Sequence, residues 1–122
     1  MLDKQGHIQQ AKHNEALAQY LEGAPYPDWR STAYFYAALH YVQAYFVSRT
    51  PPQNFKKHSD RDTAIESDGR IGGIWSDYRS LKDWSQNARY IGRKPSDAEI
   101  KNDILKSLAA IKKEISRHVP ID

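Results

Sequence analysis

The stretch from Trp29 to Phe46, WRSTAYFYAALHYVQAYF, decides the fold of this 122-residue chain. After Arg30 it carries no Asp, Glu, Lys or Arg, and helical spacing sorts its side chains into two stripes. One stripe contains Trp29, Ala33, Tyr36, His40, Ala44 and Val47, and the other contains Phe35, Leu39, Val42 and Phe46. A helix that is apolar on several sides is surrounded by other helices. We therefore expect a central helix, too short and too polar at His40 and Gln43 to cross a membrane.

The segments on either side of this helix also repeat their apolar residues at helical spacing, and the last segment carries Ile100, Ile104, Leu108, Ile111 and Ile115. The expected long helices are 2–22, the central helix, 74–90 and 97–118, and a short helix is expected from Ser59 or Asp60 to Gly69. Asp28 is expected to cap the central helix, and Thr50-Pro51-Pro52 to end it. Ser96 and Glu99 match a capping box for the last of these helices. No segment alternates like a strand. The pattern predicts one all-α domain over residues 1–122, an up-and-down antiparallel bundle of four long helices and one short helix.

Composition narrows the classes of function. The chain has no cysteine, which excludes disulfides and thiolate chemistry and suits a reducing compartment. No secretory leader is recognised, so we expect a cytoplasmic protein. The formal charge of +3 and pI near 9.1 permit contact with nucleic acid without establishing it. The eight tyrosines and three tryptophans either fill gaps between helices or stack on bases.

Familiar catalytic and metal-binding motifs are absent. There is no phosphate-binding glycine loop, no HExxH and no calcium loop, and the five histidines are scattered. Gly69, Gly72 and Gly73 are interpreted as a hinge. We therefore expect no metal and no cofactor.

Two histidines and the Tyr78–Tyr90 segment remain as candidates for binding. His40, inside the central helix, is either a satisfied interior residue or a functional imidazole. His58 is either solvated or binds an anion together with Arg61. In the later segment, Tyr78 and Ser85 share an inward row with Leu81 and Ala88. Basic side chains such as Arg89 either complement the helix dipole or, paired with Tyr90, hold a phosphate and stack a base.

Two of these segments resemble HEPN domains. Residues 31–44, STAYFYAALHYVQA, are similar to the AYYAxFHAAxA helix of that family. The later Tyr78-x2-Leu81-x3-Ser85-x3-Arg89-Tyr90 is similar to its YxxLxxxRxxADY segment, with Ser85 at a position where relatives often have Arg. The resemblance covers most of the chain. It implies an all-α bundle, a homodimer, and a role beside nucleotidyltransferases or in toxin–antitoxin and defence systems.

The resemblance does not extend to the nuclease motif. Catalytic HEPN members are metal-independent ribonucleases with an Arg, four to six residues, and then a His, but no histidine of this chain has an Arg at that distance upstream. The first hypothesis is therefore a non-catalytic HEPN-like protein that associates with a partner protein or with a nucleotide or RNA. The alternative is a divergent ribonuclease that uses His40 or His58 with Arg61 or Arg89. A small-ligand pocket among the tyrosines is a third option.

Overall fold

The computed structural model describes residues 2–122, and within them every regular element is helical. The α-helices are α1 (Lys4–Tyr20), α2 (Pro27–Val47), α3 (His58–Ser67), α4 (Trp75–Gln86), α5 (Asp97–Glu99) and α6 (Leu105–Ser116). A 3₁₀ turn, η1 (Gly72–Ile74), precedes α4, and π-helical stretches follow α4 (η2, Asn87–Ile91) and α5 (η3, Ile100–Ile104). The predicted all-α class is confirmed.

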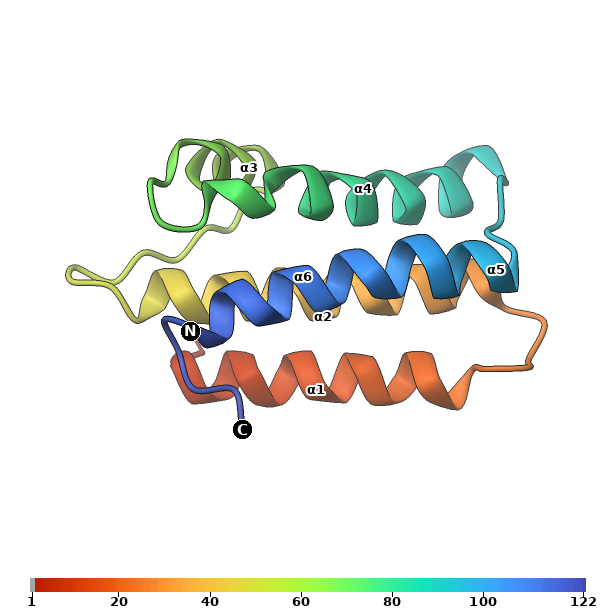
Figure 1. The fold of residues 1–122 in the computed structure, drawn as a ribbon, viewed down its shortest axis with the longest axis horizontal. Coiled ribbons are helices and arrows are strands. Elements are labelled where there is room, and N and C mark those ends of the chain that lie inside the picture. Colours follow the sequence, from red (N-terminus) through yellow and green to blue (C-terminus); the bar gives the residue numbers. More distant parts are fainter. Residues whose placement is uncertain (1) are drawn as a thin grey trace.

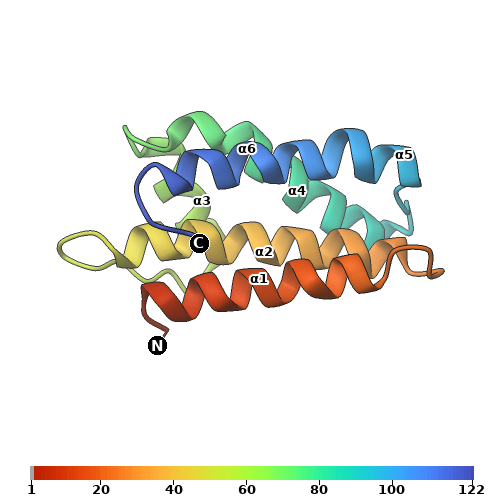
Figure 2. The same ribbon diagram turned by 60° about the horizontal axis from the view of Figure 1, so that its bottom comes forward.

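The longer helices lie lengthwise beside one another, and α1 packs along α2 (Figure 1). Seen from a second direction, α6 lies over α2 with α4 behind it (Figure 2). The chain reverses direction between successive long helices, and the connection from α2 to α4 contains α3 and η1. Both termini lie at the end of the molecule where α2 finishes. Among the described residues, no helix has the length and apolar character needed to traverse a lipid bilayer.

The central helix is enclosed on most of its surface. Phe35 and Phe46 of the second predicted stripe are each 1% exposed, and Tyr41 and Tyr45, which belong to neither stripe, are also at most 1% exposed. The last helical segment covers them with its predicted row of Ile100, Ile104, Leu108, Ile111 and Ile115, all buried. Burial of side chains of this size supplies the main stabilising free energy of such a fold.

Polar contacts join three helices at the centre of the bundle. The hydroxyl of Tyr41 on α2 donates to the carboxylate of Glu15 on α1, and the Nζ of Lys112 on α6 lies 3.2 Å from the other oxygen of Glu15. Burial, followed by the contact with Glu15, raises the pKa of Tyr41. These contacts fix the rotation of α1 and α6 about α2 and therefore which face of α2 remains open.

The beginning of the central helix differs from the prediction. Asp28 was expected to be the N-cap, but α2 begins at Pro27, and Tyr26 occupies the cap position without a side-chain hydrogen bond. Proline is well suited to the first position of a helix, because its fixed φ is helical and its missing N–H is not needed there. Asp28 instead lies in the first turn. The capping box of Ser96 and Glu99 is confirmed.

Candidate nucleotide-binding site

Three of the candidate residues meet on one side of α2. His40 comes from α2, and His58 and Arg61 come from the first turn of α3, which packs beside it. The ring of Tyr36, four residues before His40 on α2, has its centroid 6.3 Å from that of His58. His7 of α1 completes the group. We call His7, His40, His58 and Arg61 the imidazole–guanidinium cluster.

Arg61 is the central residue of this cluster, and its whole side chain is buried at 5% exposure. Its Nε donates to the Oε1 of Gln43 at 3.4 Å, its Nη2 donates to the carbonyl of Phe55, and its Nη1 lies 3.3 Å from the Nδ1 of His58. All these acceptors are neutral. Within residues 2–122, no carboxylate oxygen lies within 4 Å of its guanidinium. Arg61 is therefore a buried positive charge without a counter-ion.

His7 and His40 form a pair between α1 and α2. Their Nδ1 atoms are 2.9 Å apart, so one ring donates a proton to the other and the two nitrogens cannot both be protonated. Burial, the neighbouring His7 and then Arg61 lower the pKa of His40 to about 4. Burial and Arg61 also lower the pKa of His7. Both rings are thus neutral near pH 7.

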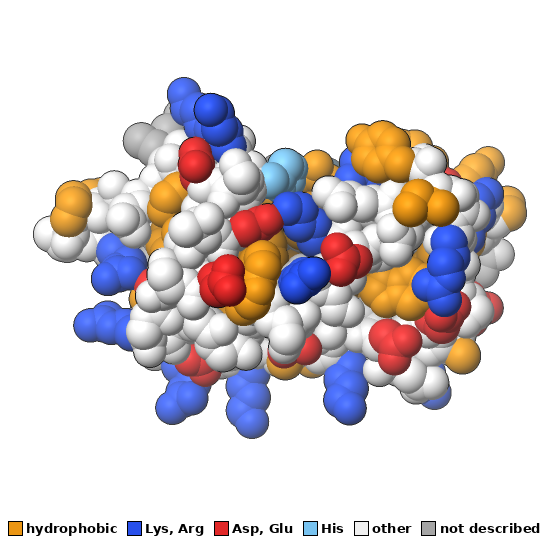
Figure 3. Space-filling model, turned by 90° about the horizontal axis from the view of Figure 1, so that it is seen from above, with side chains coloured by type: hydrophobic (Ala, Val, Ile, Leu, Met, Phe, Trp, Pro, Cys, Tyr) orange, Lys and Arg blue, Asp and Glu red, His pale blue; other side chains and the backbone are white. Residues whose placement is uncertain are grey.

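His58 is the exposed member of the cluster. Its pKa is lowered by burial of the ring and by the nearby charges of Arg61 and Lys82. Lys82 itself pairs with Asp62, so that carboxylate is occupied. Seen from the side of α3 and α4, a histidine side chain lies at the surface among acidic and basic side chains (Figure 3). Because His58 is exposed, the cluster can be reached from solvent at this residue.

Tyr78 and Ser85 on α4 are fully buried, as their inward spacing predicts. The ring of Tyr78 lies edge-on to Phe35, with centroids 5.5 Å apart, and burial raises the pKa of its hydroxyl. Within the described part of the chain, that hydroxyl has no hydrogen-bond partner. The hydroxyl of Ser85 lies 3.4 Å from that of Thr32 on α2. These two residues support the site and are not exposed to a ligand.

Arg89 and Tyr90 lie farther along the same helix. The Nε of Arg89 donates to the carbonyl of Ser85 at 3.2 Å, and its guanidinium lies 5.0 Å from the centroid of the Tyr90 ring. Tyr90 is 77% exposed at the end of the π-helical stretch and does not join the cluster. Arg89, which is half-buried, contributes to the electrostatic field at His58.

A groove between α1 and α2 leads to the cluster. Its volume is about 610 Å³, and its apolar walls narrow to more polar groups at the His40 end. The lining comes from two helical stripes: Gln10, Asn14, Leu17 and Leu21 on α1, and Tyr26, Trp29, Thr32, Ala33, Tyr36 and His40 on α2. Trp29, expected to be enclosed, is 55% exposed here. The sequence analysis did not select His7 or Tyr36 as site residues; only their positions in the fold place them there.

Small-molecule sites are concave and largely apolar, with a few convergent polar groups. The groove has this character, and its polar lining side chains include Gln10, Asn14, Thr32 and His40. The other members of the cluster do not line the groove: His7 contacts His40, and the buried guanidinium of Arg61 lies beside His58. A cation among neutral imidazoles suits an anion. No group of three or more His, Asp or Glu side chains within residues 2–122 is placed to hold a metal ion. Comparisons of the chain with protein-family models, curated proteins and solved structures find no match.

Proposed function

We propose that this chain is a non-catalytic HEPN-like helical protein that acts by association, and that it binds a nucleotide, free or within RNA, at the imidazole–guanidinium cluster. The observation that carries this proposal is Arg61. Transferring a guanidinium from water into a protein interior costs several kcal/mol unless a negative charge accompanies it. The acceptors around Arg61 satisfy part of its hydrogen bonding but supply no charge. A phosphate group beside His58 would supply that charge.

The aromatic ring next to the cluster supports a nucleotide over a simple anion. Tyr36 is half-buried, lines the groove, and has its ring centroid 6.3 Å from that of His58. Bases stack on such rings with little dependence on sequence, at about 1–3 kcal/mol for each base. A phosphate at Arg61 and a base on Tyr36 would therefore be held by adjacent groups. The all-α class and the quoted motifs also agree with a HEPN-like bundle.

Binding of a fluorescent single-stranded RNA and of free nucleotides, followed by polarisation, tests this proposal. Arg61→Gln should weaken binding about ten-fold or more, because it removes a charge-assisted hydrogen bond. Arg61→Lys keeps the charge but loses the guanidinium fork, so its binding affinity should fall between those of the unaltered protein and Arg61→Gln. Arg79→Gln is the matched control, since Arg79 is exposed on α4 and its guanidinium pairs with Asp83 at 3.9 Å.

Arg61 is buried, so its variants are checked for folding by urea unfolding, and His58→Ala provides a second variant on the exposed side. Affinity should fall as salt rises if phosphates are contacted. A flat salt response, or equal affinity of folded Arg61→Gln and the unaltered protein, would refute nucleotide binding at this site.

A divergent metal-independent ribonuclease is the second candidate function, and the contact between His58 and Arg61 favours it. A proton acceptor and a cation lie 3.3 Å apart there, which are the groups that attack by a 2′-hydroxyl requires. His40 is less suited, because its pKa near 4 makes it a weak base. RNA incubated with the protein in the presence of a chelator separates the two functions. Cleavage that His58→Ala abolishes would replace the binding proposal.

A homodimer is part of the proposal as well. Large apolar side chains are exposed at the end of the bundle where α1 ends and α2 begins: Leu17, Tyr20, Tyr26 and Trp29, with Tyr90 and Ile91 at the same end of the molecule. Clusters of this kind on a small protein mark association surfaces. Light scattering should therefore give twice the chain mass of 14.1 kDa. A monomer that forms a complex only with a nucleotidyltransferase-type protein would contradict the homodimer.

A further inference from the structure

A second basic pocket lies at the opposite end of the bundle from Trp29. Its volume is about 570 Å³, and three segments far apart in the sequence form it: the end of α2, the connection after α3 and the end of α6. Its lining is almost entirely polar and consists of Tyr45, Ser48, Arg49, Thr50, Arg70, Arg117 and His118. We call this set the Arg70 pocket. None of its residues belongs to the imidazole–guanidinium cluster.

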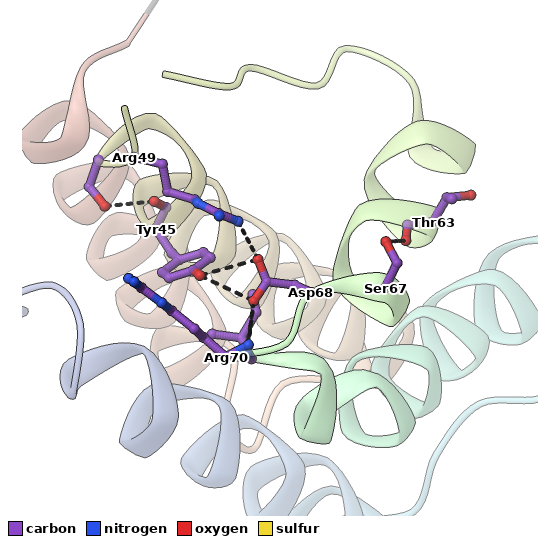
Figure 4. A network of polar contacts seen from close by, with 8 residues as sticks. Tyr45, Arg49, Thr63, Ser67, Asp68 and Arg70 are labelled. Atoms are coloured by element: carbon purple, nitrogen blue, oxygen red, sulfur yellow. Dashed lines mark hydrogen bonds and ion pairs between the residues drawn. The ribbon is translucent and has the colours of Figure 1, made fainter. Parts of the chain in front are cut away.

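Asp68 holds one wall of this pocket together. Its carboxylate, 3% exposed, accepts hydrogen bonds from the hydroxyl of Tyr45, the guanidinium of Arg49, and the backbone N–H groups of Arg70 and Ile71 (Figure 4). Burial alone would raise the pKa of Asp68, but these donors outweigh it, and the pKa is lowered. The negative charge of Asp68 is therefore fully committed.

The side chain of Arg70 points away from this carboxylate and extends past the ring of Tyr45 (Figure 4). In the described part of the chain, its guanidinium has no carboxylate within 4 Å. On the opposite wall, Glu114 pairs with Arg117 at 3.2 Å and lies 3.5 Å from His118. Three guanidinium groups thus face two carboxylates, and Arg70 is the unpaired one.

Two of these arginines have a structural role at the negatively polarised C-terminal ends of α2 and α6. Arg49 and Arg117 follow the last turn of α2 and α6, where positive side chains offset the helix dipole. Arg70 has no such role, because it follows the Asp68 turn after α3. Its guanidinium is free to bind an anion, and Thr50 lies in the same hollow, whereas the hydroxyl of Ser48 already donates to the carbonyl of Tyr45.

We propose that the Arg70 pocket binds the diphosphate group of a small molecule. Guanidinium groups recognise phosphate oxygens in pairs, and arginines on separate walls suit two linked phosphates better than one carboxylate. The ligand class follows from the three arginines that line the pocket, Arg49, Arg70 and Arg117. The pocket is independent of the nucleotide site, so either site can fail without the other.

Calorimetric titration with inorganic pyrophosphate tests this inference, with orthophosphate and acetate at equal ionic strength as comparisons. Pyrophosphate should bind most tightly. Arg70→Gln should weaken its binding about ten-fold or more. Arg70 is chosen over Arg49 because loss of Arg49 would leave the buried Asp68 without its cation.

Two control variants complete the experiment. Arg79→Gln, an exposed arginine on α4, should leave pyrophosphate binding unchanged. Arg61→Gln should also leave it unchanged, which distinguishes this pocket from the nucleotide site. Equal binding of pyrophosphate and acetate, no binding by the unaltered protein, or full binding by folded Arg70→Gln would each overturn the inference.

Discussion

The two faces of α2 carry similar aromatic residues but lie in different environments. On one face, Phe35, Tyr41 and Tyr45 are at most 1% exposed. On the other, Trp29 is 55% exposed, and Tyr36 and His40 are half-buried along the groove with α1. The first face supports the fold, and the second is open to a ligand or partner. Aromatic content alone therefore cannot distinguish a core face from a binding face.

The largest expected change in the free energy of unfolding comes from a substitution on the enclosed face of α2. Phe35→Ala should lower the free energy of unfolding by about 3–5 kcal/mol, because it removes a buried ring and leaves a cavity. Urea unfolding followed by circular dichroism measures this change. Phe35→Leu, which fills most of the space, should cost less than half as much. If Phe35→Ala lost under about 1 kcal/mol, the enclosure of this face would be wrong.

Acidification should act on the open face. The pKa of His40 in the folded chain is about 4, below the 6.5 of an unperturbed histidine. At pH above 6.5 the ring is neutral in both the folded and the unfolded state, so its burial costs no stability through protonation. As pH falls from 6.5 towards 4, the unfolded state binds the proton first and stability is lost, by roughly 2 kcal/mol after allowing for partial exposure.

Urea unfolding at about pH 7 and about pH 4.5 measures this loss of stability. Carboxylates also titrate between these two pH values, so the effect of His40 is isolated by comparing variants. His40→Gln should show a smaller drop in stability between the two conditions than the unaltered protein. His13→Gln, at an exposed position of α1, is the matched control and should keep the full drop. Identical drops in all three proteins would mean that His40 is not held neutral by its contacts.

Most of the fold could be predicted from the sequence, because helical spacing reports which face of each segment is apolar. Ile100, Ile104, Leu108, Ile111 and Ile115 were placed correctly by this pattern alone. The start of α2 was not, because Asp28 was expected to be the N-cap although the helix already begins at Pro27, and the first position of a helix accepts proline. Trp29 was misplaced because periodicity gives the direction of a side chain but not whether another helix covers it.

The site was predictable only where its residues are close in sequence. His58 and Arg61 are three residues apart on one helix, so their contact follows from helical geometry. The pair of His7 and His40 joins residues 33 apart and depends on how α1 lies against α2. The burial of Arg61 likewise depends on Gln43 and Phe55, which no local pattern connects to it. Tertiary packing, rather than residue type, determines this part of the site.

The smallest expected effect on stability is at the open end of the groove, and it gives the sharpest contrast with Phe35. Trp29→Ala should change the free energy of unfolding by no more than about 0.5–1 kcal/mol, because over half of this side chain is already in water. The same variant should shift the mass from light scattering towards the monomer, since an exposed aromatic side chain contributes strongly to an interface. Trp84→Ala, on α4 and packed against the core, is the control: it should lower stability but keep the dimer. A large loss of stability in Trp29→Ala with an unchanged mass would show that both faces of α2 serve the fold alone.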